Sequence, residues 1–218
     1  MKLTIFSDIH GRHREVEQAD YIDDSDVLIC CGDFMRTGTL DELAEFNEWL
    51  GTLPQRDKII IAGNHDHCLE SQREEAVKLI TNAHYLENSA LVIDDIKFWG
   101  SPFCPSLRDT TFGKLQHRMW SVWGQMPNDT DVLITHTPPR GVFDFSESRG
   151  GAHVGCTALI NCVLAIQPKV HCFGHINEGG GKHEENFNGT IFANAAILDK
   201  KYKVANKPIK IEMTKNEK

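Results

Sequence analysis

The sequence lacks the long apolar runs that a membrane-spanning protein needs. No stretch of about 18 consecutive apolar side chains, the length that crosses a bilayer as a helix, occurs in its 218 residues. Residues 1–4 also lack a positively charged lead followed by an apolar segment long enough for export. We therefore expect a soluble cytoplasmic protein without a membrane partner.

Positive net charge is also missing. Lys and Arg total 23 against 31 Asp and Glu, which gives a formal net charge of -8 at pH 7. A protein that holds nucleic acid by neutralising phosphates needs the opposite balance, so we expect no stable nucleic-acid binding. A small phosphate substrate is not excluded, because bound metal ions invert the local electric field whatever the net charge.

Paired cysteines are absent too. The seven cysteines form an odd set with no CxxC spacing, which favours neither a disulfide framework nor a thiolate zinc site. Since most of them lie within apolar runs, we expect reduced side chains packed in the core. Repeats and low-complexity tracts are missing as well, and the length fits one domain over residues 1–218.

The sequence does contain a recurring pattern, in which an apolar run ends in side chains that can bind metal. The clearest case is residues 59–62 (IIIA), which precede Asn64 and His65. An apolar run of this length bounded by polar residues is typical of a buried strand. Four more runs have the same form: residues 3–6 precede Asp8 and His10, residues 27–31 precede Asp33, residues 132–135 precede His136, and residues 170–173 precede His175 and Asn177.

Helical patterns separate these strands. Thr39 and Glu42 form a capping box before apolar residues at helical spacing, and residues 72–80 and 156–166 also predict helices. Strand and helix therefore alternate, which predicts an α/β (α+β) layer architecture with ligands beyond the carboxyl ends of the strands. Residues 85–99 predict an antiparallel section, residues 101–131 a flap-like insertion, and residues 190–197 with 208–213 a closing strand pair.

The polar residues at the strand ends are a mixed set of oxygen and imidazole donors. Carboxylates and histidines without thiolates suit Mn²⁺, Fe, Mg²⁺, Ni²⁺ or Zn²⁺. The set exceeds what one ion with an open position needs, so we expect two divalent ions, with Asp33 as the carboxylate that bridges them. Its members are Asp8, His10, Asp33, Asn64, His65, His136, His175 and Asn177.

The motifs, in this order, resemble those of the calcineurin-like metallophosphoesterase superfamily. They are Asp8-x-His10, Gly32-Asp33, Gly63-Asn64-His65-Asp66, His136 and Gly174-His175-x-Asn177, and they span nearly the whole chain. Residues 100–103 (GSPF), 135–141 (THTPPRG) and 173–176 (FGHI) are most similar to the metallophosphoesterase-domain-containing group, relatives of class III cyclic-nucleotide phosphodiesterases. The fold implied by this resemblance is a four-layer α-β-β-α sandwich with mixed sheets.

The resemblance also implies a role for each residue. It places Asp8, His10 and Asn177 on metal one, Asp33 between the metals, and Asn64, His136 and His175 on metal two. The catalytic residue His65 then protonates the leaving oxygen while a metal-bound hydroxide attacks phosphorus. This implies a metal-dependent phosphoric ester hydrolase with two divalent ions, Mn²⁺ first among them. Its substrate is expected to be a small phosphoester, as in a phosphodiesterase acting on nucleotides or cyclic nucleotides.

Two positions depart from the family pattern. Asn177 stands where the family has a histidine, and its amide oxygen is a weaker donor. An alternative function is therefore a nucleotide- or metal-binding module with little turnover. Arg36 stands where many members have an acidic residue that orients the catalytic histidine, so Arg36 could instead clamp a substrate phosphate and Asp66 could orient His65. His153 precedes a predicted helix and either binds substrate phosphate or hydrogen-bonds within its loop.

Overall fold

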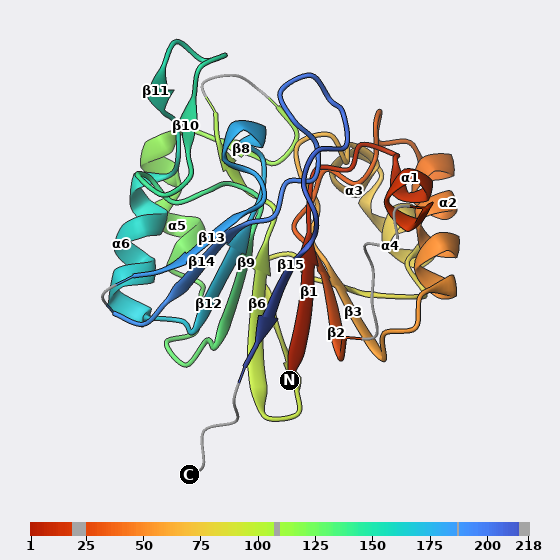
Figure 1. Cartoon of the computed structure of the whole chain (residues 1–218), viewed down its shortest axis with the longest axis horizontal. Coiled ribbons are helices and arrows are strands. Elements are labelled where there is room, and N and C mark those ends of the chain that lie inside the picture. Colours follow the sequence, from red (N-terminus) through yellow and green to blue (C-terminus); the bar gives the residue numbers. More distant parts are fainter. Residues whose placement is uncertain (19–24, 107–109, 187, 214–218) are drawn as a thin grey trace.

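The computed structural model of the chain contains two β-sheets that lie face to face (Figure 1). It describes residues 1–18, 25–106, 110–186 and 188–213. The first sheet has the strand order β15-β1-β2-β3-β4, in which β1 to β4 run parallel and β15 pairs antiparallel with β1. Its strands are β1 (Lys2–Phe6), β2 (Val27–Cys30), β3 (Asp57–Ile60), β4 (His84–Tyr85) and β15 (Ile209–Glu212).

The second sheet has the strand order β13-β14-β12-β9-β6-β5. Strands β6, β9, β12 and β14 run parallel, and β5 and β13 pair antiparallel at the two edges. Asp94 and Asp95 join β5 to β6 with positive φ angles, as a two-residue hairpin turn requires. The antiparallel section predicted for residues 85–99 is therefore present in β5 and β6, but it is wrong for Tyr85, which pairs parallel with β3 in the first sheet. The strands are β5 (Ser89–Ile93), β6 (Ile96–Ser101), β9 (Val132–Thr135), β12 (Val170–Phe173), β13 (Lys182–Glu185) and β14 (Ile191–Asn194).

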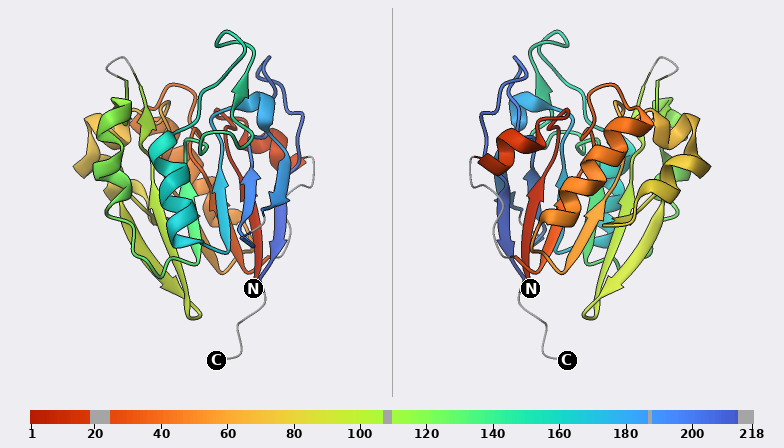
Figure 2. Two further views of the ribbon diagram at one scale, coloured as in Figure 1. Left: turned by 90° about the vertical axis from the view of Figure 1, so that its left-hand side faces the viewer. Right: turned by 90° about the vertical axis from the view of Figure 1, so that its right-hand side faces the viewer.

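Helices cover the outer face of each sheet (Figure 2). On the first sheet lie α1 (His13–Gln18), α2 (Leu40–Thr52), α3 (Cys68–Ser71) and α4 (Arg73–Leu79), and on the second lie α5 (Trp120–Trp123) and α6 (Thr157–Ile166). Three buried clusters fill the spaces between the two sheets, between the first sheet and its helices, and between the second sheet and its helices. The predicted four-layer α-β-β-α sandwich with mixed sheets is confirmed.

Strand β2 shows why its sequence is a continuous apolar run. Val27 and Ile29 belong to the cluster between the sheets, whereas Leu28 and Cys30 belong to the cluster under the helices. Successive side chains of a strand point to opposite faces, so a strand that is covered on both sides needs apolar residues at every position. The same packing accounts for the cysteines, since six of the seven are buried.

Helix α2 begins as its sequence predicts. The Thr39 side chain accepts a hydrogen bond from the backbone N–H of Glu42 at 3.2 Å. The Glu42 carboxylate turns back to the backbone N–H groups of Thr37 and Gly38, at 2.8 and 2.9 Å. These bonds satisfy donors that a helix start otherwise leaves free, and they fix the loop that follows β2.

The closing strand pair predicted for residues 190–197 and 208–213 is wrong. Strand β14 pairs with β12 and β13 in the second sheet, whereas β15 pairs with β1 in the first. Burial explains the separation. Three of the four residues of β14 are buried, as in an interior strand, whereas buried Ile209 and Ile211 alternate with exposed Lys210 and Glu212 in β15, as at a sheet edge.

The segment predicted as a flap, residues 101–131, holds short elements on the second sheet; its residues 107–109 lie outside the described part. Trp123 is buried against Trp99, with the ring centroids 6.3 Å apart, whereas Trp120 is 52% exposed. The elements are β7 (Cys104–Pro105), β8 (Gly113–Lys114), η1 (Gln116–Arg118) and α5, followed later in the chain by β10 (Phe145–Ser146), β11 (Ala152–His153) and η2 (Asn177–Gly179).

Candidate metal centre

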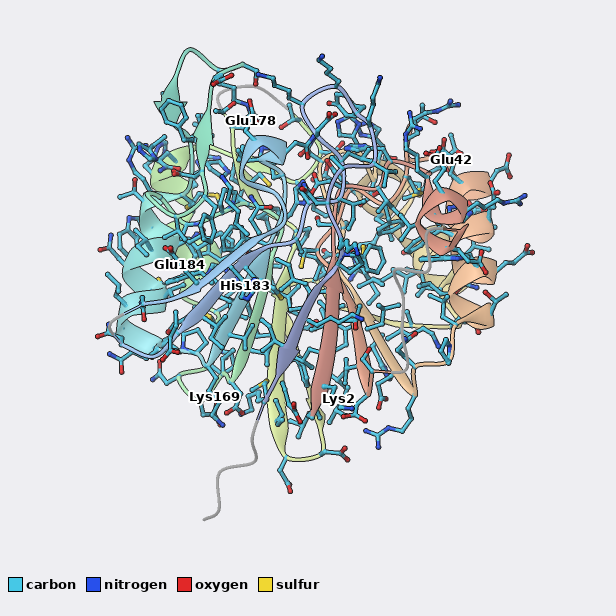
Figure 3. The ribbon with its side chains drawn as sticks, in the orientation of Figure 1. Lys2, Glu42, Lys169, Glu178, His183 and Glu184 are labelled. Carbon is cyan, nitrogen blue, oxygen red and sulfur yellow. The ribbon has the colours of Figure 1, made fainter. Side chains whose placement is uncertain are left out.

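Five parallel strands finish at one end of the sandwich, and the predicted ligands follow them there. Figure 3 labels Glu42 and Glu178 at this end and Lys2 and Lys169 at the opposite end. The carboxyl ends of parallel strands lie at the same edge of a sheet, so the segments that follow these five strands lie close together. Asp8 and His10 follow β1, Asp33 follows β2, Asn64 and His65 follow β3, His136 follows β9, and His175 follows β12.

The predicted ligands themselves tie the two sheets together at this end. His136, from the second sheet, has its Nδ1 2.8 Å from the carbonyl oxygen of Cys31, from the first. The backbone N–H of His175 donates to Asp8 Oδ2 at 2.8 Å, which joins the ends of β12 and β1. The candidate site therefore lies on the seam between the sheets.

His136 faces two oxygen donors across this seam. Its Nε2 lies 3.4 Å from Asp33 Oδ2 and 3.1 Å from Asn64 Oδ1. Because Nδ1 bonds to the Cys31 carbonyl, Nε2 is the ring nitrogen that meets these oxygens. Ligand atoms of Asp8, Asp33 and His136 all lie within 4.8 Å of one another, close enough for one cation to draw them together.

A second group of ligand atoms shares Asp33. One atom each from His10, Asp33 and His65 lies within 4.8 Å of the others, and His10 Nε2 is 3.9 Å from Asp33 Oδ2. The rings of His10 and His65 meet edge to face with centroids 4.7 Å apart. Asp33 therefore belongs to both groups, which is the position that a bridging carboxylate occupies in a two-metal site.

Two glycines make this convergence possible. A Cβ atom on Gly63 would lie 2.3 Å from Asp33 Oδ1, and one on Gly174 would lie 2.1 Å from Asp8 Oδ2. Real Cβ atoms do not approach other atoms so closely, so a side chain at either position would displace a carboxylate. The glycines of the GNHD and GHIN motifs are thus required by space.

Four of the predicted ligands have left-handed backbone conformations. The φ angles are 55° for Asp8, 43° for His10, 53° for Asp33 and 67° for His175. Asp and His enter this region more readily than most residues, yet each instance costs about 1 kcal/mol or more. The backbone turns sharply directly after the strands, which aims side chains from neighbouring strands at one point.

Charge and burial act differently on the three histidines. Desolvation lowers the pKa of His10 and lowers that of His175 well below its usual value, which leaves both rings neutral at pH 7. Burial also opposes charge on His136, but the adjacent Asp33 carboxylate outweighs it and raises the pKa to about 9. A cation that binds His136 Nε2 therefore has to displace a proton.

The prediction that Asp66 orients His65 is not supported by the hydrogen bonds of Asp66. Its buried carboxylate accepts from the backbone N–H groups of Gly63 at 2.7 Å, Asp33 at 2.9 Å and Met35 at 3.0 Å. Asp66 therefore joins the loops that follow β2 and β3. The Nδ1 atom of His65 instead lies 3.4 Å from the backbone carbonyl oxygen of Arg36.

Arg36, His153 and Asn177 were predicted outside the regular family pattern, and their surroundings differ. The Arg36 side chain is 78% exposed and lies 4.0 Å from Glu42. The His153 Nδ1 contacts the buried Asp144 carboxylate, so the hydrogen bonding within its loop is present. Asn177 begins η2 two residues after His175, and its Oδ1 atom is buried with no hydrogen-bond partner, as a donor awaiting a cation would be.

Two residues near the site had no signal in the sequence. Arg149, in the loop between β10 and β11, has its Nη2 atom 3.1 Å from Nε2 of His175. Tyr202, at φ 57°, lies edge-on to His10 with centroids 5.1 Å apart. Their loops are also joined by an ion pair of 2.8 Å between Lys200 and Glu147. Neither loop carries a motif, and both residues reach the site through contacts with segments that are distant in the sequence.

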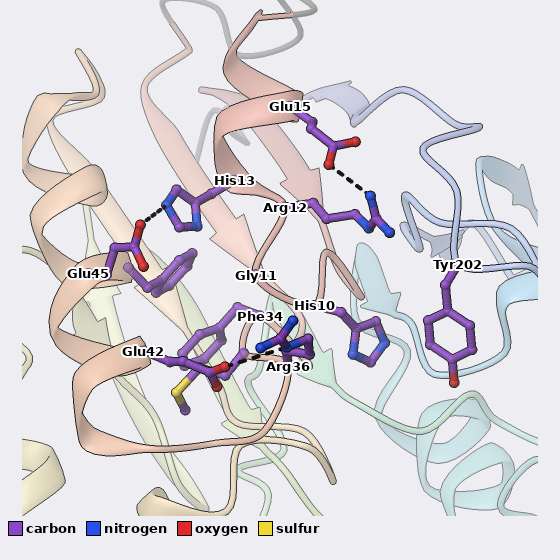
Figure 4. A pocket seen from close by; sticks show the side chains of 12 residues that line it. His10, Gly11, Arg12, His13, Glu15, Phe34, Arg36, Glu42, Glu45 and Tyr202 are labelled. Atoms are coloured by element: carbon purple, nitrogen blue, oxygen red, sulfur yellow. Dashed lines mark hydrogen bonds and ion pairs between the residues drawn. The ribbon is translucent and has the colours of Figure 1, made fainter.

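Two cavities lie beside predicted site residues. One of about 560 Å³ is lined by His10, Arg12, Arg36 and Tyr202 (Figure 4). A second cleft, of about 870 Å³, lies against Arg149, which contacts His175. Arg140, Ser106, Ser148 and Gln116 also line this cleft, and no acidic residue is among its described lining residues.

Residues 1–179 match the calcineurin-like phosphoesterase family. A UPF0046 protein of Caenorhabditis elegans is 35% identical over 228 residues, covering 96% of this chain and 79% of its own length. Human metallophosphoesterase domain-containing protein 1 is 33% identical, covering 95% of this chain and 69% of its own. The chain belongs to the calcineurin-like phosphoesterase family. The resemblance seen in the motifs is confirmed, and the protein is a metal-dependent phosphoester hydrolase by family.

Solved structures agree on the fold. Phosphopantetheinyl hydrolase from Mycobacterium tuberculosis superposes with a TM-score of 0.66 at 14% identity, covering 92% of this chain and 90% of its own. A protein of Thermus thermophilus gives 0.61 at 12% identity, with 88% of each chain covered. Family members depend on a binuclear metal centre and act on small phosphoesters.

No helix in the described part of this chain has the length and apolar character that a bilayer crossing requires.

Proposed function

We propose that this protein is a phosphodiesterase that cleaves small nucleotide-type esters, cyclic nucleotides among them. The observation that carries the proposal is the pair of cavities, one beside His10 and one beside Arg149. An acyclic phosphodiester carries a separate organic group on each of two oxygens, so both groups need space, whereas in a cyclic nucleotide both ester oxygens belong to one sugar. A monoester needs space on one side alone. Cavities of about 560 and 870 Å³ each have the volume of a small-molecule site.

The metal assignment keeps the roles implied by the family resemblance, with Asp33, which belongs to both groups of ligand atoms, as the bridge. Metal one would be held by Asp8, His10 and Asp33, with Asn177 as a further oxygen donor; metal two would be held by Asp33, Asn64, His136 and His175. This mixture of carboxylate, amide and imidazole donors favours Mn²⁺, with Fe, Mg²⁺, Ni²⁺ or Zn²⁺ as alternatives. When bound, two such ions lower the pKa of water and neutralise charge on the phosphoryl oxygens.

His65 is the proposed proton donor to the leaving oxygen. Its Nδ1 is directed at the Arg36 carbonyl at 3.4 Å, which leaves Nε2 to hold the proton that is transferred. Its ring also lies against His10, within reach of the Asp33 group. A backbone carbonyl thus takes the place of the acidic side chain, and Arg36 keeps its guanidinium for substrate.

Substrate charge would be met from both cavities. Arg36 lies in the cavity beside His10, and Arg149 and Arg140 lie in the cleft beside His175. A planar guanidinium can bind two phosphate oxygens at once. Tyr202 offers an aromatic face next to His10 on which a nucleotide base could stack. His153, which is held by Asp144, lies in β11, directly after the loop that carries Arg149, as a polar residue for the substrate.

The test is a substrate panel with the Mn²⁺-loaded protein: a bis-aryl phosphodiester, a cyclic nucleotide and an aryl phosphomonoester. We expect kcat/KM for the two diesters to exceed that for the monoester by about tenfold or more. His65→Asn should lower kcat by about 10²–10⁴-fold while two metal ions remain bound. Efficient cleavage of the monoester alone would instead identify a phosphatase.

A second candidate, a nucleotide- or metal-binding module with little turnover, rests on Asn177. Its Oδ1 atom has no partner, and the residue lines a cavity of about 530 Å³ that none of the other predicted ligands lines. An amide is a weaker donor than imidazole, so metal one would bind loosely. Asn177→His should then raise kcat by about tenfold or more. An unchanged kcat would remove the basis of this second function.

A further inference from the structure

A third group of ligand atoms in the structure includes a thiol. The Sγ atom of Cys104 and one ring nitrogen each of His136 and His175 all lie within 4.8 Å of one another. Cys104 comes from β7, in the segment of residues 101–131, whereas the histidines follow β9 and β12. Three separate segments therefore bring a sulfur atom to the two histidines assigned to metal two.

Cys104 is held at this place by the backbone around it. The residue is 4% exposed, its N–H donates to the Phe112 carbonyl at 3.0 Å, and β7 pairs with β8 at Cys104 and Gly113. The contact of its thiol with the Pro102 carbonyl is long, at 3.7 Å, so little is lost when the sulfur takes another partner. The side chain is thus fixed beside the histidines without being committed to another strong bond.

We propose that Cys104 is a ligand of metal two, alongside His136 and His175. Coordination would form a metal–sulfur bond and break the S–H bond, with the proton released to solvent. Bonds of about 2.3 Å to sulfur and about 2.1 Å to nitrogen at a tetrahedral angle place two donors about 3.4 to 3.6 Å apart, so donors that lie within 4.8 Å of one another would have to close by at most about 1.4 Å. The inference rests on the proposed metal centre, but not on the proposed reaction.

A thiolate changes which metals the site prefers. Soft sulfur donors favour Zn²⁺, Co²⁺ and Cd²⁺ over Mn²⁺ and Mg²⁺. Metal two would then be the thiophilic position of the pair, and metal one, which has oxygen and imidazole donors, would keep the preference for Mn²⁺. The two positions should therefore fill with different metals when both are offered.

The test is the absorption spectrum of the full chain loaded with Co²⁺ after removal of other metals by a chelator. We expect a sulfur-to-cobalt charge-transfer band in the wild type that disappears in Cys104→Ser. Cys162→Ser is the matched control, because this half-buried cysteine belongs to none of the metal-capable groups of the described residues, and it should keep the band. A wild-type protein that binds Co²⁺ without this band, or a band that persists in C104S, would overturn the proposal.

Two further measurements keep the proposal testable. If C104S does not fold, cadmium NMR of the wild type decides: a resonance in the sulfur-ligated range supports it, and one in the range of nitrogen and oxygen ligands alone overturns it. In a folded C104S protein, we expect Zn²⁺ affinity at metal two to fall by about tenfold or more and Mn²⁺ affinity to change by less than about threefold. Failure to bind any cation would remove the metal centre itself, whereas an inactive protein with the band would refute the phosphodiesterase alone.

Discussion

The buried carboxylate of Asp66 should be as important for the metal centre as a ligand, although we assign it no metal. Its Oδ2 atom accepts from the N–H groups of Asp33 and Gly63, and its Oδ1 atom accepts from that of Met35. In Asp66→Asn the amide oxygen can take the place of Oδ2 and keep the bonds from Asp33 and Gly63. The amide NH₂ group then faces the N–H of Met35, so two donors meet in a buried place.

The size of the effect follows from these three bonds. Losing one charge-assisted hydrogen bond costs about 2 kcal/mol, and weakening two others to neutral bonds costs about 1 kcal/mol each. The sum is at most about 4 kcal/mol, because the desolvation that raises the pKa of Asp66 well above its usual value offsets part of the benefit of its charge. Urea unfolding followed by tryptophan fluorescence measures this loss directly. Because the loops that hold Asp33 and His65 separate, we also expect bound Mn²⁺ to fall below two ions per chain.

Asp144→Asn is the matched control. Asp144 is also fully buried and accepts two backbone N–H bonds, from Gly141 at 3.0 Å and Gly155 at 2.9 Å, but it joins no predicted ligand loops. D144N should lose stability of the same order and keep both ions. The reasoning is refuted if D66N loses less than about 1 kcal/mol, or if it binds as much Mn²⁺ as D144N does.

Three other substitutions test the site and the core. Gly174→Ala should lower Mn²⁺ affinity by about tenfold or more in calorimetric titration, because the new Cβ would lie 2.1 Å from Asp8 Oδ2. Arg149→Gln should raise KM for the cleaved diester by about tenfold with a smaller change in kcat, because its guanidinium lies at the mouth of the site. His171 is buried, and desolvation lowers its pKa to about 3, so the folded state holds it neutral while the unfolded chain protonates it near pH 6.5. The contribution of neutral His171 to the free energy of unfolding is complete above about pH 6.5, and it declines by about 1.4 kcal/mol per pH unit as pH falls toward 3. Urea unfolding at several acid pH values measures this decline, and His171→Phe should remove the part of it that His171 causes.

Each of these has a control in the same chain. Gly124→Ala, where the added Cβ meets nothing closer than 3.1 Å, should leave metal affinity unchanged. Arg56→Gln, next to the opposite end of β3, should leave KM unchanged, so an equal rise in both arginine variants would count against a specific role for Arg149. His84→Phe, a 48% exposed histidine, should keep the acid slope of the wild type. An H171F protein with that same slope would contradict the assignment to His171.

The strands and their ligands could be predicted because both are local in the sequence. A strand covered on both faces has to be apolar throughout, and the side chain that follows its end has to lie at the edge of the sheet. Asp33 and His136 were therefore predictable although they are 103 positions apart in the sequence, which is the difference of their residue numbers. That prediction follows from the edge at which the strands before Asp33 and His136 both end, and it needs no knowledge of a contact between the two residues.

What could not be predicted depends on contacts between segments without a pattern. The role of Asp66 is set by three backbone N–H groups, and backbone donors are the same in every sequence. Arg149 and Tyr202 reach the site from loops whose path is fixed by tertiary contacts. The strands of residues 191–194 and 209–212 have suitable patterns for pairing, but burial on one or two faces assigns them to different sheets.

The left-handed backbone at Asp8, His10, Asp33 and His175 has a consequence for how this protein can change by mutation. Glycine adopts such φ angles without steric cost, so replacing one of these ligands by glycine relieves about 1 kcal/mol of strain while it removes a metal donor. At Asp8 and Asp33 the carboxylate also accepts a backbone N–H, from His175 and His65, which glycine would leave unpaired. Binding and folding therefore favour opposite residues at His10 and His175. A library selected for heat resistance alone would accumulate glycine at these two positions, whereas selection in the presence of scarce metal would restore His.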